Sequence, residues 1–304
     1  MRNLTRPQMQ AAALAFAIAL GIALGVAERP QFLDTNWIEV YLLPIFFLLI
    51  GMEMRGEFNH GYFRQRNRIY APLAAAVAGV AVPGAIYVAV TGEFGFGATV
   101  PTATDLTLGL ATLAFLSSGA TARLRVKFIA FATFDDLIGL LFLTVGFGSG
   151  LPTTVLGFLI GLLIPDVPRL RTALDLIANY AVVPLFALAA ANGFGEHLLS
   201  PLSIPVLIGV AIRPIGKLLG IGLAGGLVER ALGNARQSRD WLYLGLLGGI
   251  GFTVSILLAE LAYGSDSSKL ASAIAGTLAA ILISAVAFLV LASRSARLGH
   301  LGEK

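Results

Sequence analysis

The chain alternates between long apolar stretches and short polar segments over almost its whole length. A membrane-spanning helix needs about 20 mostly apolar residues. The pattern predicts about ten such spans, at residues 9–27, 38–55, 70–91, 98–118, 122–147, 151–165, 173–192, 203–228, 240–263 and 268–292. The sixth is short and needs tilt or support from its neighbours. The predicted fold class is an all-α polytopic membrane protein, with residues 1–304 forming a single membrane domain.

The composition agrees with this pattern. Hydrophobic residues make up 57% of the 304 positions and charged residues 12%, whereas a soluble domain carries about 25% charged residues. Cysteine is absent, which excludes disulfides and thiolate metal sites. His60, His197 and His300 fall in predicted loops or a tail, so no imidazole metal cluster is expected. We expect the lipid bilayer as a partner, and neither nucleic acid nor a cofactor.

Basic residues lie mostly on one side of the predicted spans. If the N-terminus is cytoplasmic, the outer loops hold only Arg29 and Lys269, and two further basic residues, Arg213 and Lys217, lie inside the eighth span. The cytoplasmic segments then carry the others: Arg2, Arg6, Arg55, Arg64, Arg66, Arg68, Arg123, Arg125, Lys127, Arg169, Arg171, Arg230, Arg236, Arg239, Arg294, Arg297 and Lys304. This asymmetry predicts a multi-pass protein of a bacterial-type inner membrane with both termini in the cytoplasm.

Two of the predicted spans contain residues that interrupt helices. Residues 101–107 (PTATDLT) interrupt the fourth span with a proline, and residues 245–253 (GLLGGIGFT) interrupt the ninth with glycines. A simple kink or close helix packing would explain either one alone. However, each is the middle span of a three-helix unit, and the two units start on opposite sides of the membrane. Paired interrupted helices in inverted repeats indicate a transporter with its site at the midplane.

Four charged residues lie well inside predicted spans: Asp105, Asp135, Asp136 and Lys217. Each costs roughly 2.5–3.5 kcal/mol at the bilayer centre on insertion scales. A satisfied helix–helix ion pair would explain any one of them, but four together indicate a function. Asp135 and Asp136 point about 100° apart on their helix, so one carboxylate can bind a cation such as Na+ while the other pairs with Lys217. Competition between a cation and a proton for the same carboxylate is the physical basis of exchange.

The interrupted fourth span supplies supporting groups. Asp105 lies where a helix N-terminus would favour a carboxylate, and Lys217 can offset the facing helix C-termini. Thr104 and Thr133 offer neutral oxygens for a cation. The alternative for each hydroxyl is a hydrogen bond to its own helix, which is favoured for Thr133 and stays open for Thr104.

Several stretches resemble the NhaA-type sodium/proton antiporters. In chain order they are residues 46–53 (FFLLIGME), 103–105 (ATD), 135–137 (DDL), 184–187 (PLFA), 216–221 (GKLLGI) and 248–256 (GGIGFTVSI). The resemblance implies inverted three-helix repeats whose two discontinuous helices cross at the midplane. It also implies a division into a transport core and a supporting panel, here residues 70–147 and 203–292 for the core and 9–55 and 151–192 for the panel.

The resemblance also assigns roles to single residues. Asp136 is similar to the family's carboxylate that binds the cation and exchanges protons. Asp135 is similar to its partner, which is tied to a lysine in one state, and Lys217 is similar to that lysine. The implied activity is secondary transport, with Na+ or Li+ exchanged for H+ by alternating access for pH and sodium homeostasis.

Further matching positions concern the crossing and its regulation. Asp105 and Thr104 match residues where the two interrupted helices cross. Glu53 and Glu57 match acidic positions near one end of the second span, where the family has a pH-responsive region. The transported ions would be the only metals bound, and a homodimer is compatible with the family.

The chain also departs from the family pattern. Family members have twelve spans, and the helix that starts near Leu151 resembles the family's eighth although it follows the fifth directly, so two spans are missing. The family's histidines in this region are absent, and Asp166, Arg169, Arg171 and Asp175 stand there instead. A transport-impaired relative is therefore an alternative to the antiporter. An intramembrane aspartyl protease built on Asp105 is disfavoured because the G-x-G-D sequence of such enzymes does not occur, and the chain is not expected to be an enzyme.

Overall fold

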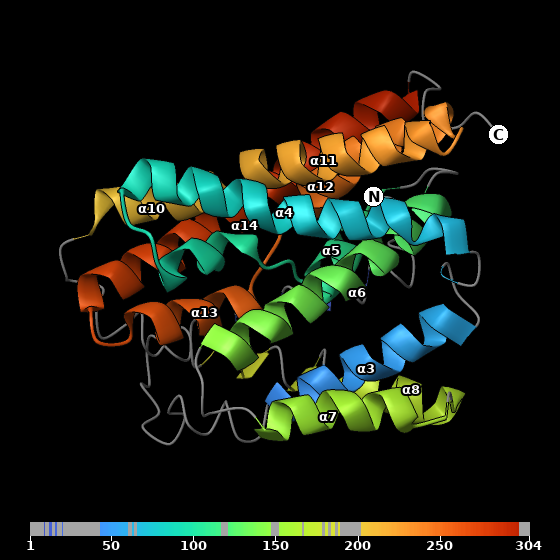
Figure 1. The fold of residues 1–304 in the computed structure, drawn as a ribbon, viewed down its shortest axis with the longest axis horizontal. Helices are drawn as coiled ribbons and strands as arrows, with labels where there is room; N and C mark the ends of the chain where they lie inside the picture. Colours follow the sequence, from blue (N-terminus) through green and yellow to red (C-terminus); the bar gives the residue numbers. More distant parts are fainter. Residues whose placement is uncertain are drawn as a thin grey trace.

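The structure is a computed structural model. It describes residues 43–59, 66–116, 121–146, 152–165, 167–177 and 202–297, together with some single positions elsewhere. Almost all of the first predicted span and most of the second half of the seventh lie outside the described residues. Every regular element in the described part is helical (Figure 1). The all-α prediction is therefore confirmed.

Most of the described helices lie within or close to predicted spans, whereas α8 begins five residues before the seventh predicted span. Their bounds are α3 Leu43–Asn59, η3 Arg66–Arg68, α4 Tyr70–Thr91, η4 Phe96–Thr102, α5 Leu106–Ala114, α6 Thr121–Gly146, α7 Pro152–Leu163, α8 Pro168–Ile177, α10 Ile204–Ala211, α11 Arg213–Ala231, η6 Ala235–Arg239, α12 Asp240–Gly248, α13 Thr253–Tyr263 and α14 Ser267–Arg297.

These helices form two groups in Figure 1. The larger group contains α4, α5, α6 and the helices from α10 to α14, with α11 packed against α4 and α12. The smaller group contains α3, α7 and α8, and it contacts the larger group where α3 meets α6. The division of the chain into a core and a panel stays a prediction.

Two helical segments of the larger group are interrupted where the sequence predicts. Between η4 and α5 the chain is extended at Ala103 and Asp105. Between α12 and α13 it bends by 53°. η4 packs on α13, and α5 packs on α12. Each half of one interrupted helix therefore lies against the opposite half of the other.

Glycines bring α11 into close contact with α4. Gly216 and Gly220 stand four residues apart, the small-xxx-small spacing that lets membrane helices approach closely. A Cβ on Gly220 would lie 2.3 Å from the carbonyl oxygen of Ala78, and one on Gly216 would lie 2.8 Å from Cα of Pro83. Lys217 lies between the two glycines, and its side chain is completely buried.

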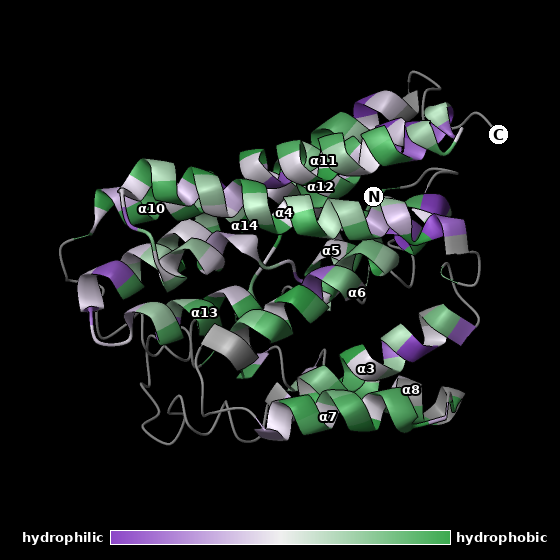
Figure 2. Cartoon of the chain, viewed as in Figure 1, coloured by the Kyte–Doolittle hydropathy of each residue, from purple (hydrophilic) through white to green (hydrophobic). Residues whose placement is uncertain are grey.

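The described helices suit a lipid environment. By length and composition, three of them could cross a membrane, namely Tyr70–Thr91, Ile204–Ala231 with its break at Ile212, and Ser267–Ser295; the bent pair Ala235–Gly248 and Thr253–Tyr263 would make a fourth. Figure 2 shows apolar residues along most helices, with hydrophilic residues gathered mainly at helix ends. This supports a membrane protein. The total of about ten spans remains a prediction.

Candidate functional site at the helix crossing

Asp105 joins the two interrupted helices. Its Oδ1 accepts a hydrogen bond from the backbone N–H of Leu108 (2.9 Å) and caps the N-terminus of α5. Its Oδ2 accepts from the hydroxyl of Thr253 (3.2 Å) and lies 3.5 Å from that residue's backbone nitrogen, at the N-terminus of α13. Its own N–H donates to the carbonyl of Ile250 (2.7 Å). One carboxylate therefore serves two helix N-termini, where negative charge is favoured.

Thr104 connects the same crossing to the buried lysine. Its hydroxyl donates to the carbonyl of Gly248 (2.9 Å), at the end of α12, and accepts from the ammonium of Lys217 (3.0 Å). The hydroxyl thus binds groups of α12 and α11. The alternative left open by the sequence, a hydrogen bond to its own helix, does not occur. By contrast, Thr133 donates to the carbonyl of Ile129 (2.8 Å) in its own helix, as favoured from the sequence.

Lys217 and Asp135 form a buried ion pair. The ammonium donates to Oδ1 (3.0 Å) and Oδ2 (3.3 Å) of Asp135. The lysine is 0% exposed and the aspartate 3%. The structure therefore pairs α6 with α11 through the two residues that the sequence suggested as partners.

Asp136 follows Asp135 on α6 but does not share its ion pair. It is 7% exposed, and among the described residues its carboxylate has no hydrogen-bond or ion-pair partner. Glu53 of α3 lies close enough for the two negative charges to interact. Glu57 also lies in α3. A buried carboxylate is costly unless a proton or a cation compensates its charge, and Asp136 is the group at this site that still needs one.

Arg213 is a functional candidate to which the sequence gave no role. It is the first residue of α11, one turn before Lys217, and is 0% exposed. Its guanidinium donates to the hydroxyl of Ser255 (2.7 Å) and to the carbonyls of Gly251 (3.0 Å) and Thr277 (3.2 Å). A buried arginine inside a predicted span was a signal, but its position next to the break between α12 and α13 depends on the tertiary fold.

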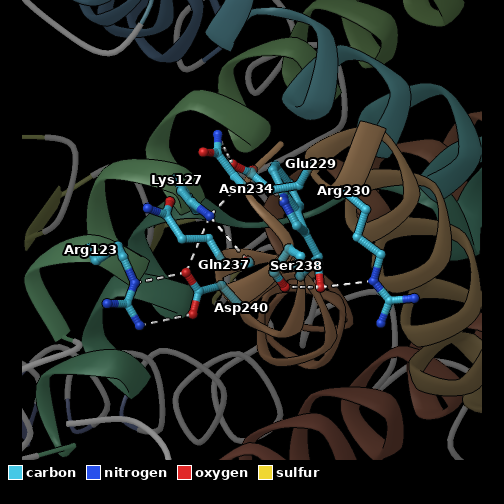
Figure 3. Close-up of polar contacts among 10 residues, drawn as sticks. Arg123, Lys127, Glu229, Arg230, Asn234, Gln237, Ser238 and Asp240 are labelled. Atoms are coloured by element: carbon cyan, nitrogen blue, oxygen red, sulfur yellow. Dashed lines mark hydrogen bonds and ion pairs between the residues drawn. The ribbon is translucent and has the colours of Figure 1, made fainter. Parts of the chain in front are cut away.

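A second polar cluster lies near the N-terminus of α6, about two turns from Asp135. Figure 3 shows side chains of α6 meeting those of α11, η6 and α12. Lys127 contacts Glu229 (3.3 Å) and Asp240 (3.2 Å). Arg123 also pairs with Asp240 (2.8 Å), and the indole of Trp241 donates to Glu229 (2.9 Å). These charges compensate one another, so this cluster is a structural connection and not a vacant ion site.

The geometry at the crossing suits a small cation or a proton. Asp135 and Asp136 are consecutive residues of α6, and among the described residues the Lys217 ammonium pairs only with the first of them. Within the described residues no group of three or more His, Cys, Asp or Glu side chains could hold a metal ion.

Comparison with known proteins identifies the family. The profile described as Na+/H+ antiporter 1 matches residues 8–165 and 145–291. A protein named Na(+)/H(+) antiporter NhaA 2, from Clavibacter michiganensis subsp. michiganensis, is 33% identical over 321 residues, covering 84% of this chain and 78% of the relative. The chain belongs to the Na+/H+ antiporter 1 family. A Na(+)/H(+) antiporter NhaA of Mycolicibacterium smegmatis is 31% identical, with 81% of this chain and 74% of the relative covered.

The form of these matches bears on the length of the chain. The alignment to the Clavibacter antiporter extends over 321 positions although it uses only 84% of the 304 residues. The alignment therefore contains residues of that relative that have no counterpart in the present chain. The two parts of the profile match overlap at residues 145–165, which is where the sequence predicts that two spans are missing.

Proposed function

We propose that this protein exchanges Na+ or Li+ for H+ across the inner membrane, with Asp136 and Asp135 as the ion- and proton-binding pair. One observation carries the proposal: Asp136 is a buried carboxylate without a hydrogen-bond or ion-pair partner among the described residues, beside a carboxylate that is held by Lys217. The relatives named as Na(+)/H(+) antiporters supply the identity of the ions.

The proposed cycle uses the difference between the two carboxylates. A proton or a cation neutralises Asp136. When a cation binds, the carboxylate of Asp135 becomes its second ligand and leaves the ammonium of Lys217, which Thr104 still holds by a hydrogen bond. Protonation of the pair releases the cation on the other side of the membrane. Each ion thus excludes the other from the same oxygens, which prevents a leak of either.

The architecture proposed around this centre follows the sequence prediction. The units α4–α6 and α10–α14 act as inverted repeats, and the interrupted helices cross at the midplane. The smaller group of helices supports the core while it moves between inward- and outward-open states. About ten spans, both termini in the cytoplasm, and a pH-responsive region at Glu53 and Glu57 complete the proposal.

The experiment that tests the function is exchange in reconstituted vesicles. The purified protein is placed in acid-loaded vesicles with an internal pH dye, and Na+, Li+ or K+ is added at several pH values. Proton release with Na+ or Li+ is expected. Protein that is correctly inserted but moves no protons with any cation would instead be a transport-impaired relative.

A pair of variants tests the site itself. Asp136→Asn removes the carboxylate that takes up the ion and should abolish exchange while the protein stays in the membrane. Thr133→Ala is the matched control on the same helix, because its hydroxyl bonds only to its own helix, and it should transport normally. Exchange by Asp136→Asn at the normal rate would show that the ion binds elsewhere.

The protease alternative gains nothing from the geometry. Both oxygens of Asp105 are occupied by groups at the N-termini of α5 and α13, so this carboxylate is not placed to activate a water molecule.

A further inference from the structure

Arg213 stands out among the buried charges because it lacks a carboxylate partner. Its side chain is fully buried, yet no Asp or Glu of the described residues lies within ion-pair distance. Neutral oxygens of Ser255, Gly251 and Thr277 hold it instead. An isolated buried charge is expensive, so its retention at this position calls for a compensating role.

Its surroundings show what it compensates. Gly251 lies in the break after α12, where Arg213 adds positive charge near the negative end of that helix. Its charge also acts on Asp135 and Lys217 without contact. Arg213 is therefore part of the electrostatics of the exchange centre, although it touches neither carboxylate of the pair.

The fully buried charges at the crossing can be added up. Asp105, Asp135 and Asp136 contribute three negative charges, and Lys217 and Arg213 contribute two positive charges. With all five ionised the centre carries a net charge of −1, which one monovalent cation or one proton neutralises. Without Arg213 the net charge would be −2.

The polar cluster at the far end of α6 does not disturb this sum. There Arg123 and Lys127 pair with Glu229 and Asp240, so the buried charges of that cluster balance, and the exposed Arg230 donates to Ser238. Glu53 of α3 also acts on Asp136 by its charge, but it is half-buried, so the sum covers only the five buried charges at the crossing.

We propose that Arg213 is a positioning and charge-balancing residue of the exchange centre: its fixed guanidinium charge sets the centre to −1, so that a single monovalent cation neutralises it and is bound weakly enough to be released. The inference rests on the proposed exchange function and adds a residue that determines cation affinity. It differs from a purely structural role, in which Arg213 would only hold α11, α13 and α14 together through its hydrogen bonds.

The test compares Arg213→Gln with the wild type in the vesicle assay. The half-saturating Na+ concentration is measured at alkaline pH, where protons compete least. Arg213→Gln should lower it roughly tenfold, because the centre then carries one more uncompensated negative charge and holds the cation more tightly, and should slow the maximal rate because release is harder.

A double variant separates charge from structure. Asp105→Asn combined with Arg213→Gln restores the net charge of −1, and asparagine still caps a helix N-terminus about as well as aspartate. Its half-saturation should return towards the wild-type value. If Arg213→Gln fails to insert, Asp105→Asn alone gives the test in the opposite direction, with a half-saturation about tenfold higher.

The outcomes distinguish the two levels of the argument. If the wild type exchanges Na+ for H+ but Arg213→Gln leaves half-saturation unchanged, only the role of Arg213 is overturned. The role of Arg213 is also overturned if the half-saturating Na+ concentration of Asp105→Asn equals that of the wild type. The same holds if the double variant is shifted as far as Arg213→Gln. If the wild type itself fails to exchange, the proposed function falls and the inference falls with it.

Discussion

Replacing Asp135 with asparagine should affect the stability of the protein far more than the same change at Asp136. The ammonium of Lys217 is completely buried and contacts both oxygens of the Asp135 carboxylate, at 3.0 and 3.3 Å. Asp135→Asn leaves this ammonium with the hydroxyl of Thr104 and a neutral amide. A positive charge then remains buried without the carboxylate that now pairs with it.

The magnitude follows from the burial of the pair. Removal of one partner from a buried ion pair costs about 3–5 kcal/mol, whereas an exposed pair contributes about 0–1 kcal/mol. A loss of about 3–5 kcal/mol corresponds to roughly two to four orders of magnitude in the ratio of folded to unfolded protein. Asp136→Asn removes a buried charge that has no ion-pair partner among the described residues, so it should leave stability unchanged or raise it.

Thermal unfolding in detergent measures the difference. Both variants and the wild type are heated, and the remaining monodisperse protein is followed by fluorescence-detected size-exclusion chromatography at one pH and without Na+. Asp135→Asn should unfold at a clearly lower temperature than the other two. If Asp135→Asn is as stable as the wild type, or if Asp136→Asn is the less stable variant, the assignment of Lys217 to Asp135 is wrong.

Two further predictions concern packing and the second polar cluster. Lys127→Met leaves Glu229 without its buried cation and should destabilise the protein by about 3–5 kcal/mol in the same assay; a loss below about 1 kcal/mol would contradict the buried network. Gly220→Val should be destabilising by at least about 1–3 kcal/mol, because a Cβ there would lie 2.3 Å from the Ala78 carbonyl. Gly139→Ala is the control, since its nearest new contact would be at 3.9 Å, and it should be neutral or stabilising; equal losses in both variants would refute the close helix approach.

The sequence predicts much of the fold because apolar length and helix-breaking residues are local signals. The span predicted at 70–91 coincides with α4, Tyr70–Thr91. Pro101 and the glycines around Gly248 correctly mark the two interruptions. Span number is harder to predict, since it depends on weakly apolar or short helices such as α7, whose status in a membrane depends on their neighbours.

The candidate site could be predicted in its members but not in all its contacts. Charged residues in apolar stretches are conspicuous, which points directly to Asp135, Asp136 and Lys217. Lys217 was expected to offset the helix C-termini, and it contacts Thr104, which binds the carbonyl of Gly248 at the end of α12. The sequence did not predict that Arg213 binds the carbonyl of Gly251 beyond this end. That contact depends on the rotation of α11 against the break in the other helix, and no spacing within the sequence encodes it.

Two ionic bridges between α6 and α11 differ in a way that matters for transport. Lys127 pairs with Glu229, and Asp135, about two turns further along α6, pairs with Lys217. The two helices are therefore antiparallel. Lys127 also binds Asp240, so the loss of one acceptor leaves another. Asp135, in contrast, is the only carboxylate on Lys217 among the described residues. In the proposed exchange cycle, a cation that draws Asp135 away would therefore break the bridge to Lys217 alone, while Lys127 and Glu229 keep α6 and α11 joined.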